Sequence, residues 1–248
     1  DGVKVASTQT TDPGTYRFAA LAPGRYTVRV TKAGWAFQPT ETALDLSADT
    51  SGVDFEAVPV VEITLAQGYN FIGVPTVPLD QHPLAVFQVA ERRVARWDPD
   101  LARTQPDNAY VLAQTGQLPE ILKVKPGVGF WVRADSDRRL QVAGRPPSSA
   151  ASVEMLLGRG WNMLANPFGA PMRWSVLGIT AGMPMRSLGF LYDRTANSYV
   201  MVSNVVGQNI VDTVPTNAAF WLYSLDRAVL QVRGATTATV SAAASKPT

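Results

Sequence analysis

Apolar and polar side chains alternate in short runs along the first part of the chain. "TYRFAAL" and "RYTVRV" both alternate with a period of two, which predicts half-buried β-strands. "TTDPG" and "LAPGR" place Pro and Gly between such runs, and both sequences favour turns. Three further runs of strand length follow: "WAFQP", "TALDLS" and "GVDFEAV". The alternation therefore predicts a small β-domain over residues 1–58.

Residues 61–144 and 153–234 form an internal repeat, in which one pattern of aromatic, apolar and polar positions occurs twice. "GYNFIGVP" opens the first copy and "GWNMLANP" opens the second. The closing segments also match: "GFWVRADSDRRLQVAG" and "AFWLYSLDRAVLQVRG". Both closing segments contain Phe-Trp, and in both a Gly lies 14 residues after the Phe. Matching anchors in the same order predict two homologous small β modules.

The middle of the repeat aligns more loosely and contains the predicted helical turns. The aligned positions are Trp97-Asp98 with Tyr192-Asp193, and Tyr110 with Tyr199. "PLAVFQVA" in the first copy and "RWSVLGI" in the second each have the length for a turn or two of helix.

Two stretches outside the modules read as connecting segments. "RPPSSAAS" (145–152) is rich in Pro and Ser and is predicted to link the two copies. Residues 235–248 contain no large apolar residue after Val240, so they are predicted to be a tail or linker.

The composition agrees with a chain of strands and turns. Charged residues make up only 17% of the 248 residues, whereas exposed helix faces usually carry many Lys and Glu side chains. Gly (19) and Pro (18) are spread along the chain, as in folds with many turns. We therefore expect an all-β chain of several modules.

The charge balance and the absence of cysteine exclude some partners and sites. The 22 basic and 20 acidic residues leave a net charge of +2, and no basic run exceeds a pair such as Arg92-Arg93. A nucleic-acid partner needs a concentrated basic surface, so none is expected. The lack of cysteine excludes disulfides, thiol catalysis and Cys-ligated zinc. No apolar run reaches the roughly 18 to 20 residues of a membrane span, so no span is expected.

Most of the first segment resembles a known β-sandwich family. The matching residues are "TTDPGTYRFAALAPGRYTVRVTKAGWAFQPT" and, further on, "DTSGVDFEAV". They are similar to the carboxypeptidase regulatory-like (transthyretin-like) family over residues 8–57. The resemblance implies a non-catalytic spacer or attachment module of secreted or surface proteins. Members of that family carry a further strand before the "TTD" turn, so this sandwich is expected to lack its first strand unless the chain is a fragment.

The tandem units resemble the "GWNLIGNP"-type accessory β modules of secreted bacterial surface proteins. The segments that carry this resemblance are the two openings of the repeat, "GYNFIGVP" and "GWNMLANP". The predicted fold class is therefore all-β and multi-module. An Ig-like or transthyretin-like sandwich comes first, and two homologous small β modules follow it.

No catalytic site is expected from the titratable residues. His82 is the only histidine, and a Ser-His-Asp triad also needs an activated serine, for which no G-x-S-x-G sequence exists. One histidine without cysteine provides too few ligands for a transition metal. We therefore predict no catalytic, cofactor-binding or metal-binding residue and no enzyme activity.

Carboxylates in two loops form the alternatives to that prediction. They are Asp98, Asp100 and Asp107 in one loop, and Asp135 and Asp137 in the other. Paired carboxylates can act as the acid and base of a glycosidase. "DPD" and "DSD" could also hold calcium, although the D-x-D-x-D-G pattern with its distal Glu is missing. The second repeat has no matching cluster, so solvated turn residues are the favoured interpretation.

The aromatic residues allow either a sugar-binding surface or a core. The chain contains six tryptophans: Trp35, Trp97, Trp131, Trp161, Trp174 and Trp221. Trp161 aligns with Tyr69, and Trp131 aligns with Trp221. Positions that stay aromatic in both copies are predicted to be core. Phe130 and Trp131 point to opposite faces of a strand, so one of the two is expected to be exposed or to lie at a domain contact.

The recurring Asn70 and Asn162 invite a functional interpretation, but a structural one is favoured. An asparagine between an aromatic and an apolar residue is expected to bond backbone groups at a bend. The preceding Gly and the Pro five residues later fit that role.

The expected function is structural or adhesive, in a secreted or cell-surface bacterial protein, with copies of the chain or neighbouring modules as partners. An unpaired sandwich edge is a site for association. The tail segment "TTATVSA" could complete the first sandwich of the next subunit and so build a filament or surface layer. The rival explanation is that the chain was cut from a longer protein. The alternative function is a carbohydrate-binding accessory module of a secreted enzyme, with a polysaccharide as partner.

Overall fold

The computed structural model describes residues 5–147, 152–179, 183–205, 207–208, 210–233 and 236–242. Its internal contacts divide the chain into two compact units, Asp1–Val58 and Pro59–Thr248. Strands are the main regular structure of both units, and the helices of the described residues are all short. The predicted all-β, multi-module fold class is thereby confirmed.

Unit 1 contains three of the predicted strands. β1 (Gly24–Val28) pairs antiparallel with β3 (Thr42–Leu46), and β2 (Trp35–Gln38) lies between them in the sequence. Exposed ion pairs cross the β1–β3 region, with Arg25 Nε 2.8 Å from Asp45 Oδ1. These strands coincide with the predicted runs "RYTVRV", "WAFQP" and "TALDLS".

The predicted strand "TYRFAAL" is wrong, although the turn before it is correct. Thr11 and Thr15 form an isolated bridge around "TTDPG", and Gly14 supplies the positive φ of 106° that this turn needs. The following residues pair with no strand among the described residues. Tyr16 is attached instead through its hydroxyl, which donates to the Val53 carbonyl at 2.6 Å. Alternation alone therefore did not produce a strand, because no ladder partner lies alongside.

The first repeat of unit 2 consists of two sheets and a few helical turns. One four-stranded sheet has the order β2, β4 (Glu56–Leu65), β10 (Arg138–Arg145), β6 (Val77–Pro78), and its strand β4 begins within unit 1, to which β2 belongs. The other has the order β5 (Gly68–Gly73), β9 (Gly129–Ala134), β7 (Val94–Trp97), β8 (Tyr110–Leu112). The helical turns are α1 (Pro83–Phe87), α2 (Pro99–Thr104), η1 (Pro106–Asn108) and η2 (Glu120–Leu122).

The second repeat is built on the same plan. One sheet has the order β11 (Ser152–Leu157), β19 (Ala228–Arg233), β20 (Thr236–Ala242). The other has the order β12 (Gly160–Ala165), β18 (Ala219–Ser224), β14 (Met185–Asp193), β15 (Ser198–Ser203), β16 (Ile210–Val211). A short pair, β13 (Met172–Arg173) with β17 (Thr213–Val214), and the turn η3 (Trp174–Leu177) complete it. Both predicted helical turns are present, as α1 and η3.

The strand registers show that the two repeats are the same structure twice. β4 pairs with β10 so that Glu62 lies opposite Gln141, and β11 pairs with β19 so that Glu154 lies opposite Gln231. In the other sheet, the Gly of each opening "Gly-aromatic-Asn" starts the pairing of β5 with β9 and of β12 with β18. The aligned positions of the sequence repeat thus occupy equivalent places in space.

Each repeat has its own apolar core between its two sheets. Ile63, Phe87 and Phe130 are completely buried in the first repeat. Phe220 and Trp174 take the corresponding place in the second repeat, with the Trp174 indole donating to the Ser187 carbonyl at 2.8 Å. The inner faces of the paired strands therefore account for the stability of each repeat.

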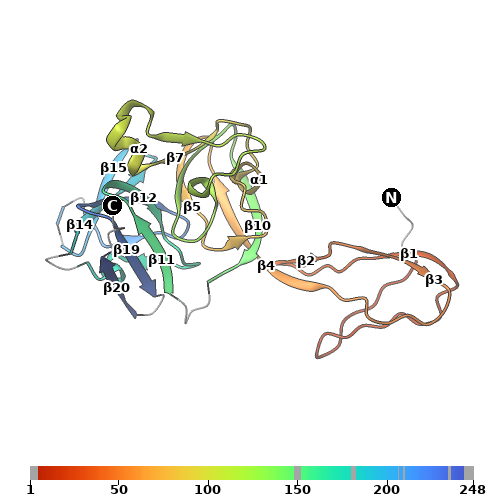
Figure 1. Ribbon diagram of the computed structural model, residues 1–248. Helices are drawn as coiled ribbons and strands as arrows, with labels where there is room; N and C mark the ends of the chain where they lie inside the picture. Colours follow the sequence, from red (N-terminus) through yellow and green to blue (C-terminus); the bar gives the residue numbers. More distant parts are fainter. Residues whose placement is uncertain are drawn as a thin grey trace, which may run out of the picture. The chain divides into compact units, whose positions relative to one another are not determined.

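The two repeats lie side by side in unit 2 (Figure 1) and are joined by paired contacts related by an approximate two-fold axis. The Gly73 amide donates to the Asn217 carbonyl at 2.8 Å, and the equivalent Ala165 amide donates to the Gly127 carbonyl at 3.0 Å. Bridges join the neighbouring residues in the same way, Ile72 with Ala218 and Val128 with Leu164. Reciprocal contacts of this kind are those of a two-fold dimer, here formed within one chain.

The segment predicted as a tail or linker contains a strand. Residues 236–242 form β20, which pairs antiparallel with β19 from Ala228 opposite Ala242 to Arg233 opposite Thr236. β11 pairs with one edge of β19, which leaves the other edge for β20. The β-branched residues of this segment favour a strand. Residues 234–235 and 243–248 lie outside the described residues. No helix of the described residues is long and apolar enough to cross a membrane.

Asn162 shows how the recurring asparagine works. Its Oδ1 accepts from the Gly158 amide at 2.8 Å, and its Nδ2 donates to the carbonyls of Gly158 (2.8 Å) and Gly160 (2.9 Å). Asn70 makes the equivalent bonds to Ala66 and Gly68. The predicted role of both asparagines as bend residues is confirmed.

We predict that Asn162→Ala lowers the free energy of unfolding by about 2 kcal/mol, because it leaves partly buried backbone groups without partners. Urea denaturation followed by tryptophan fluorescence measures this. The control Asn204→Ala removes an exposed asparagine and should change the value by less than about 0.5 kcal/mol. A loss at Asn162 no larger than in the control would contradict the bend role.

Candidate functional site

Six aromatic side chains line a groove of about 380 Å³ in unit 2. The first repeat supplies Trp97 and Tyr110, and the second repeat supplies Trp161, Phe190, Tyr199 and Trp221. Among the described residues, no other side chain lines the groove. The groove is therefore a feature of the duplicated unit, since neither repeat contains all of it.

Strand alternation positions these rings on the face opposite each core. In β18, Phe220 points into the core of the second repeat and Trp221 points into the groove. In the first repeat, Trp97 of β7 lies opposite Tyr110 of β8 in the strand register. Both sheets thus carry an apolar inner face and an aromatic outer face, and the outer faces meet.

The rings pack mostly edge to face. The Trp97 ring centroid lies 5.1 Å from that of Tyr110 and 6.0 Å from that of Trp221, and Trp161 lies 5.7 Å from Phe190. The Trp221 indole donates to the Tyr199 hydroxyl at 3.3 Å. Neighbouring contacts of this kind restrict the rings, so the groove is largely preformed.

Three of the rings are open to solvent. The exposed fractions are 37% for Trp161, 43% for Tyr110 and 50% for Tyr199. Burial raises the pKa of the Tyr110 phenol above its usual value and the nearby Tyr199 adds to this, while a hydrogen bond with the Trp131 side chain opposes it. The phenol therefore keeps its proton at neutral pH. The lining of the groove, as far as the structure describes the chain, contains no charged side chain and presents apolar faces and neutral hydroxyls.

The prediction that the repeated aromatic positions are core is wrong for the opening strands. Trp161 is 37% exposed and its counterpart Tyr69 is 57% exposed. Both lie outside the core of their repeat: Trp161 lines the groove, and Tyr69 packs against Trp131. The prediction for Phe130 and Trp131 is confirmed, since Phe130 is buried in the first core and Trp131 packs against residues of both repeats.

Sequence reasoning missed Tyr110, Phe190 and Tyr199 as members of the site. The signal was present in part, because Tyr110 and Tyr199 are aligned in the two repeats. What the sequence lacked was the fact that β5, β7 and β9 of one repeat pack against β12 and β18 of the other. The remaining tryptophans lie elsewhere: Trp174 is in the second core, and Trp35 of unit 1 carries Lys32 Nζ 5.1 Å from its ring centroid.

His82 has a structural role. Its Nδ1 accepts from the Leu84 amide at 3.2 Å, which caps the start of α1, and its Nε2 lies 3.2 Å from the Gln114 carbonyl oxygen. Both ring nitrogens are therefore engaged with backbone groups. No serine and no carboxylate contacts the imidazole in the hydrogen bonds of the described residues.

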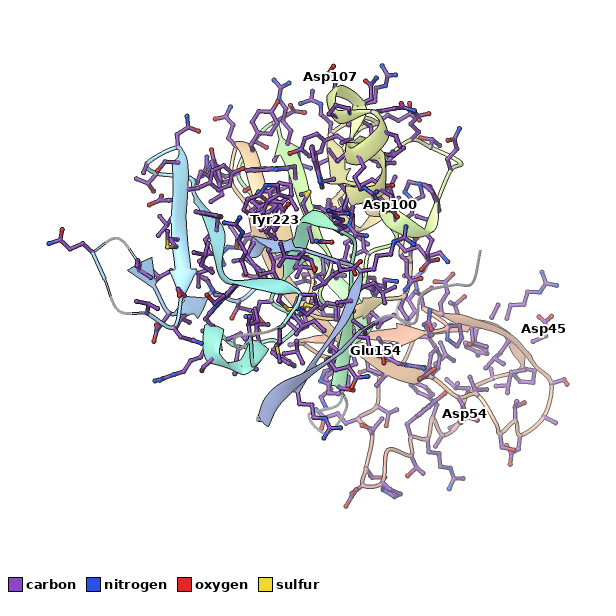
Figure 2. All side chains as sticks on the ribbon, turned by 60° about the vertical axis from the view of Figure 1, so that its left-hand side comes forward. Asp45, Asp54, Asp100, Asp107, Glu154 and Tyr223 are labelled. Carbon is purple, nitrogen blue, oxygen red and sulfur yellow. The ribbon has the colours of Figure 1, made fainter. Side chains whose placement is uncertain are left out.

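The carboxylates considered for catalysis or calcium are engaged separately. Asp98 caps α2 by accepting hydrogen bonds from the Asp100 and Leu101 amides. Its counterpart in the second repeat, Asp193, accepts from the Thr195 and Ala196 amides. Asp100 pairs with Arg227 at 2.7 Å, and Asp107 lies apart from it in η1 (Figure 2).

The second acidic loop has the same character. Asp135 pairs with Arg93 at 2.7 Å, and Asp137 accepts from the Gln67 amide at 2.7 Å. Within the part of the chain that the structure describes, no three His, Cys, Asp or Glu side chains lie close enough to hold a metal ion.

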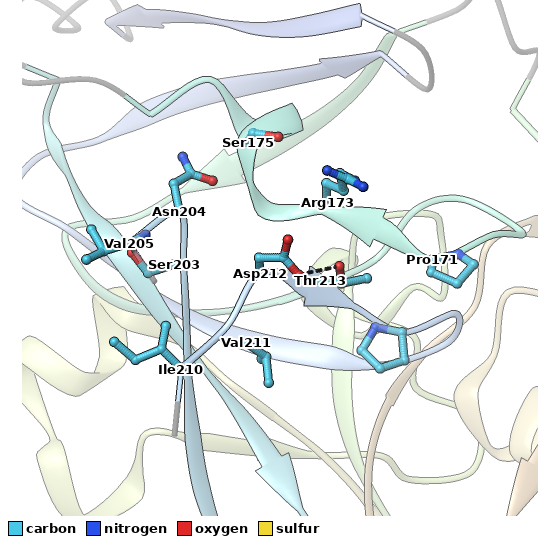
Figure 3. Close-up of a pocket in the computed structure, with 11 residues that line it drawn as sticks. Pro171, Arg173, Ser175, Ser203, Asn204, Val205, Ile210, Val211, Asp212 and Thr213 are labelled. Carbon is cyan, nitrogen blue, oxygen red and sulfur yellow. Dashed lines mark hydrogen bonds between the residues drawn. The ribbon is translucent and has the colours of Figure 1, made fainter. Parts of the chain in front are cut away.

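A larger hollow of about 870 Å³ lies beside β13, β16 and β17 (Figure 3). Its polar side chains include Arg173, Ser175 and Asp212, and the Thr213 hydroxyl donates to Asp212 Oδ1 at 2.8 Å. Arg173 and Asp212 are both exposed, so water screens their charges. The charged side chains among the described lining residues of the hollow are therefore both exposed.

The fold and the groove define a class: an all-β chain made of a β-sandwich unit and a duplicated β unit that carries an aromatic groove. Residues 1–60 of the chain match the family model described as BOS complex subunit NOMO1-like, second beta sandwich domain. This match supports the predicted sandwich, because residues 1–60 match a related β-sandwich family and not the carboxypeptidase regulatory-like family itself. The comparisons with curated proteins and with solved structures gave no match.

Proposed function

We propose that the chain is a non-catalytic adhesive segment of a secreted or cell-surface protein, and that unit 2 binds a polysaccharide in its aromatic groove. The observation that carries the proposal is the groove itself, with six aromatic rings and three of them well exposed. Pyranose rings have apolar C–H faces that stack on aromatic side chains, and hydroxyl edges that bond to polar groups.

The polar groups of the groove suit the edges of a sugar. The hydroxyls of Tyr110 and Tyr199 both donate and accept hydrogen bonds, and both belong to exposed rings. The lining contains neither a pair of carboxylates nor a nucleophile with a base, and both are needed to cleave a glycosidic bond by the common mechanisms. These features favour binding without catalysis.

Unit 1 fits the same proposal as a spacer or attachment module. Its resemblance to the carboxypeptidase regulatory-like family and its family match to a β-sandwich domain both support that role. Strand donation between subunits has less support, because the segment "TTATVSA" forms β20 and pairs with β19 of its own sheet.

We expect electrophoresis in gels that contain polysaccharides to retard the chain. The panel includes hydroxyethylcellulose, xyloglucan, laminarin, polygalacturonate and alginate. Trp161→Ala should lower the affinity derived from the retardation about tenfold or more. Losing one ring contact that the bound sugar buries costs about 1.5 to 3 kcal/mol. Trp35→Ala is the matched control, because Trp35 is 38% exposed but belongs to unit 1.

Retardation that Trp161→Ala abolishes and Trp35→Ala leaves intact supports the proposal. No retardation by any polysaccharide would overturn it. So would binding of a proline-rich peptide in the groove without binding of any glycan, because aromatic grooves also take extended proline helices.

A further inference from the structure

Four rings of the groove, Tyr110, Trp97, Trp221 and Trp161, form a first aromatic row, and a second row mirrors it across the approximate two-fold axis. Ring centroids are separated by 6.3 Å from Tyr69 to Trp131, by 4.9 Å from Trp131 to Tyr192, and by 5.8 Å from Tyr192 to Tyr199. Each of these residues has an aromatic counterpart in the other repeat. The row ends at Tyr199, which already belongs to the groove, so the aromatic surface extends beyond the six lining residues.

The outer end of each row carries an exposed arginine above an aromatic ring. The Arg133 guanidinium carbon lies 5.9 Å from the Tyr69 ring centroid, at the end of the second row. At the end of the first row, the Arg186 guanidinium carbon lies 5.1 Å from the Tyr223 centroid, and Tyr223 lies 5.2 Å from Trp161. A guanidinium in this position is held over the ring by cation–π attraction.

These two arginines differ from several others of unit 2 in having no acidic partner. Arg93, Arg139 and Arg227 all form ion pairs with carboxylates. Neither Arg133 nor Arg186 forms one with any carboxylate of the described residues, and both are exposed. Each outer end therefore presents a positive charge that is free to bind an anion, while the lining of the groove between them is neutral.

We infer that the ligand is an acidic polysaccharide, whose uronic acid carboxylates bind Arg133 and Arg186 while its sugar rings stack on the aromatic rows. The inference rests on the proposed function and adds the ligand's charge and length. Arginine is well suited to carboxylates because its planar fork donates two parallel hydrogen bonds. Charges at both ends and rings between them require an oligomer that reaches across both repeats.

Calorimetric titration of the full chain with hexagalacturonate and with its fully methyl-esterified form tests the inference. The two probes share one carbohydrate chain and differ in their carboxylate charge. We expect the acid to bind at least tenfold more tightly than the ester. Arg133→Gln and Arg186→Gln should each weaken binding of the acid about threefold to fivefold and leave the ester unchanged. Arg17→Gln, which removes an exposed charge from unit 1, is the control and should change neither.

Equal affinity of the parent chain for the acid and the ester would overturn the inference. It would also be overturned if the arginine variants lost as much affinity for the ester as for the acid. Binding of a neutral glucan in the gels, without binding of hexagalacturonate, would also overturn it and leave the proposed function standing. The proposed function fails separately, when no polysaccharide of either charge binds. A digalacturonate that binds as tightly as the hexamer would contradict the required length.

Discussion

Gly129→Ala is expected to lower the free energy of unfolding of unit 2 by about 3 kcal/mol. A Cβ at this position would lie 2.5 Å from the Leu164 carbonyl oxygen and 3.0 Å from the Ala219 Cβ, both in the other repeat. The nearest atom belongs to the backbone, which cannot turn aside as a flexible side chain can. The methyl group must therefore push the repeats apart and weaken the aromatic contacts between them. Urea denaturation followed by tryptophan fluorescence measures the loss.

The matched control is Gly169→Ala. A Cβ at Gly169 would meet no atom within 4 Å, and its backbone does not need a positive φ. Its free energy of unfolding should stay within about 0.5 kcal/mol of the parent value. If Gly129→Ala and Gly169→Ala had the same free energy of unfolding, the repeats would not pack against each other at Gly129 as described.

The double variant Trp161→Ala, Tyr199→Ala is expected to weaken polysaccharide binding by about 100-fold or more. The two rings lie on different strands of the second repeat, β12 and β15, so each provides a separate stacking surface. Each lost ring contact costs about 1.5 to 3 kcal/mol, and costs at separate positions roughly add. Calorimetric titration with the polysaccharide that retards the parent chain most strongly measures the change.

Fold integrity of the double variant is checked by its circular dichroism and its urea midpoint. Both rings are well exposed, so little core is removed. A folded double variant that binds as tightly as the parent chain would contradict the assignment of the groove.

The sequence was informative where the two repeats could be compared. The bend role of Asn70 and Asn162 and most strands follow from alternation, turn residues and matched segments. These features depend on neighbours within a few residues along the chain. The sandwich class of unit 1 was implied by the resemblance of residues 8–57 to a known β-sandwich family.

The groove could not be derived in the same way, because it depends on contacts between strands far apart in sequence. In "GWNMLANP", the residues of both faces are largely apolar, so alternation does not separate the core face from the interface face. Met163 and Leu164 are both almost completely buried, but Leu164 packs in the second core and Met163 packs between the repeats. Aromatic residues kept in both copies therefore looked like core.

The pairing of β20 within its own repeat was missed for a related reason, since "TTATVSA" was expected to be a tail or to complete the sandwich of another subunit. A run of Thr, Ala, Val and Ser carries little hydrophobic signal, and its strand state depends on a free edge of β19. Whether such an edge exists is a property of the assembled sheet. The segment "TYRFAAL" shows the opposite case. Its apolar and polar residues alternate strongly, but no strand of the described residues pairs with it.

The most direct measurement is the ¹⁵N–¹H spectrum of the indole groups, which gives one signal for each of the six tryptophans. Single Trp→Phe variants assign the signals, and hexagalacturonate or cellohexaose is then titrated into the full chain. If the aromatic groove binds glycans, the signals of Trp97, Trp161 and Trp221 shift with ligand concentration, while those of Trp35 and the buried Trp174 stay in place. Binding that leaves the three groove signals unchanged, or that shifts Trp35 alone, would contradict the account.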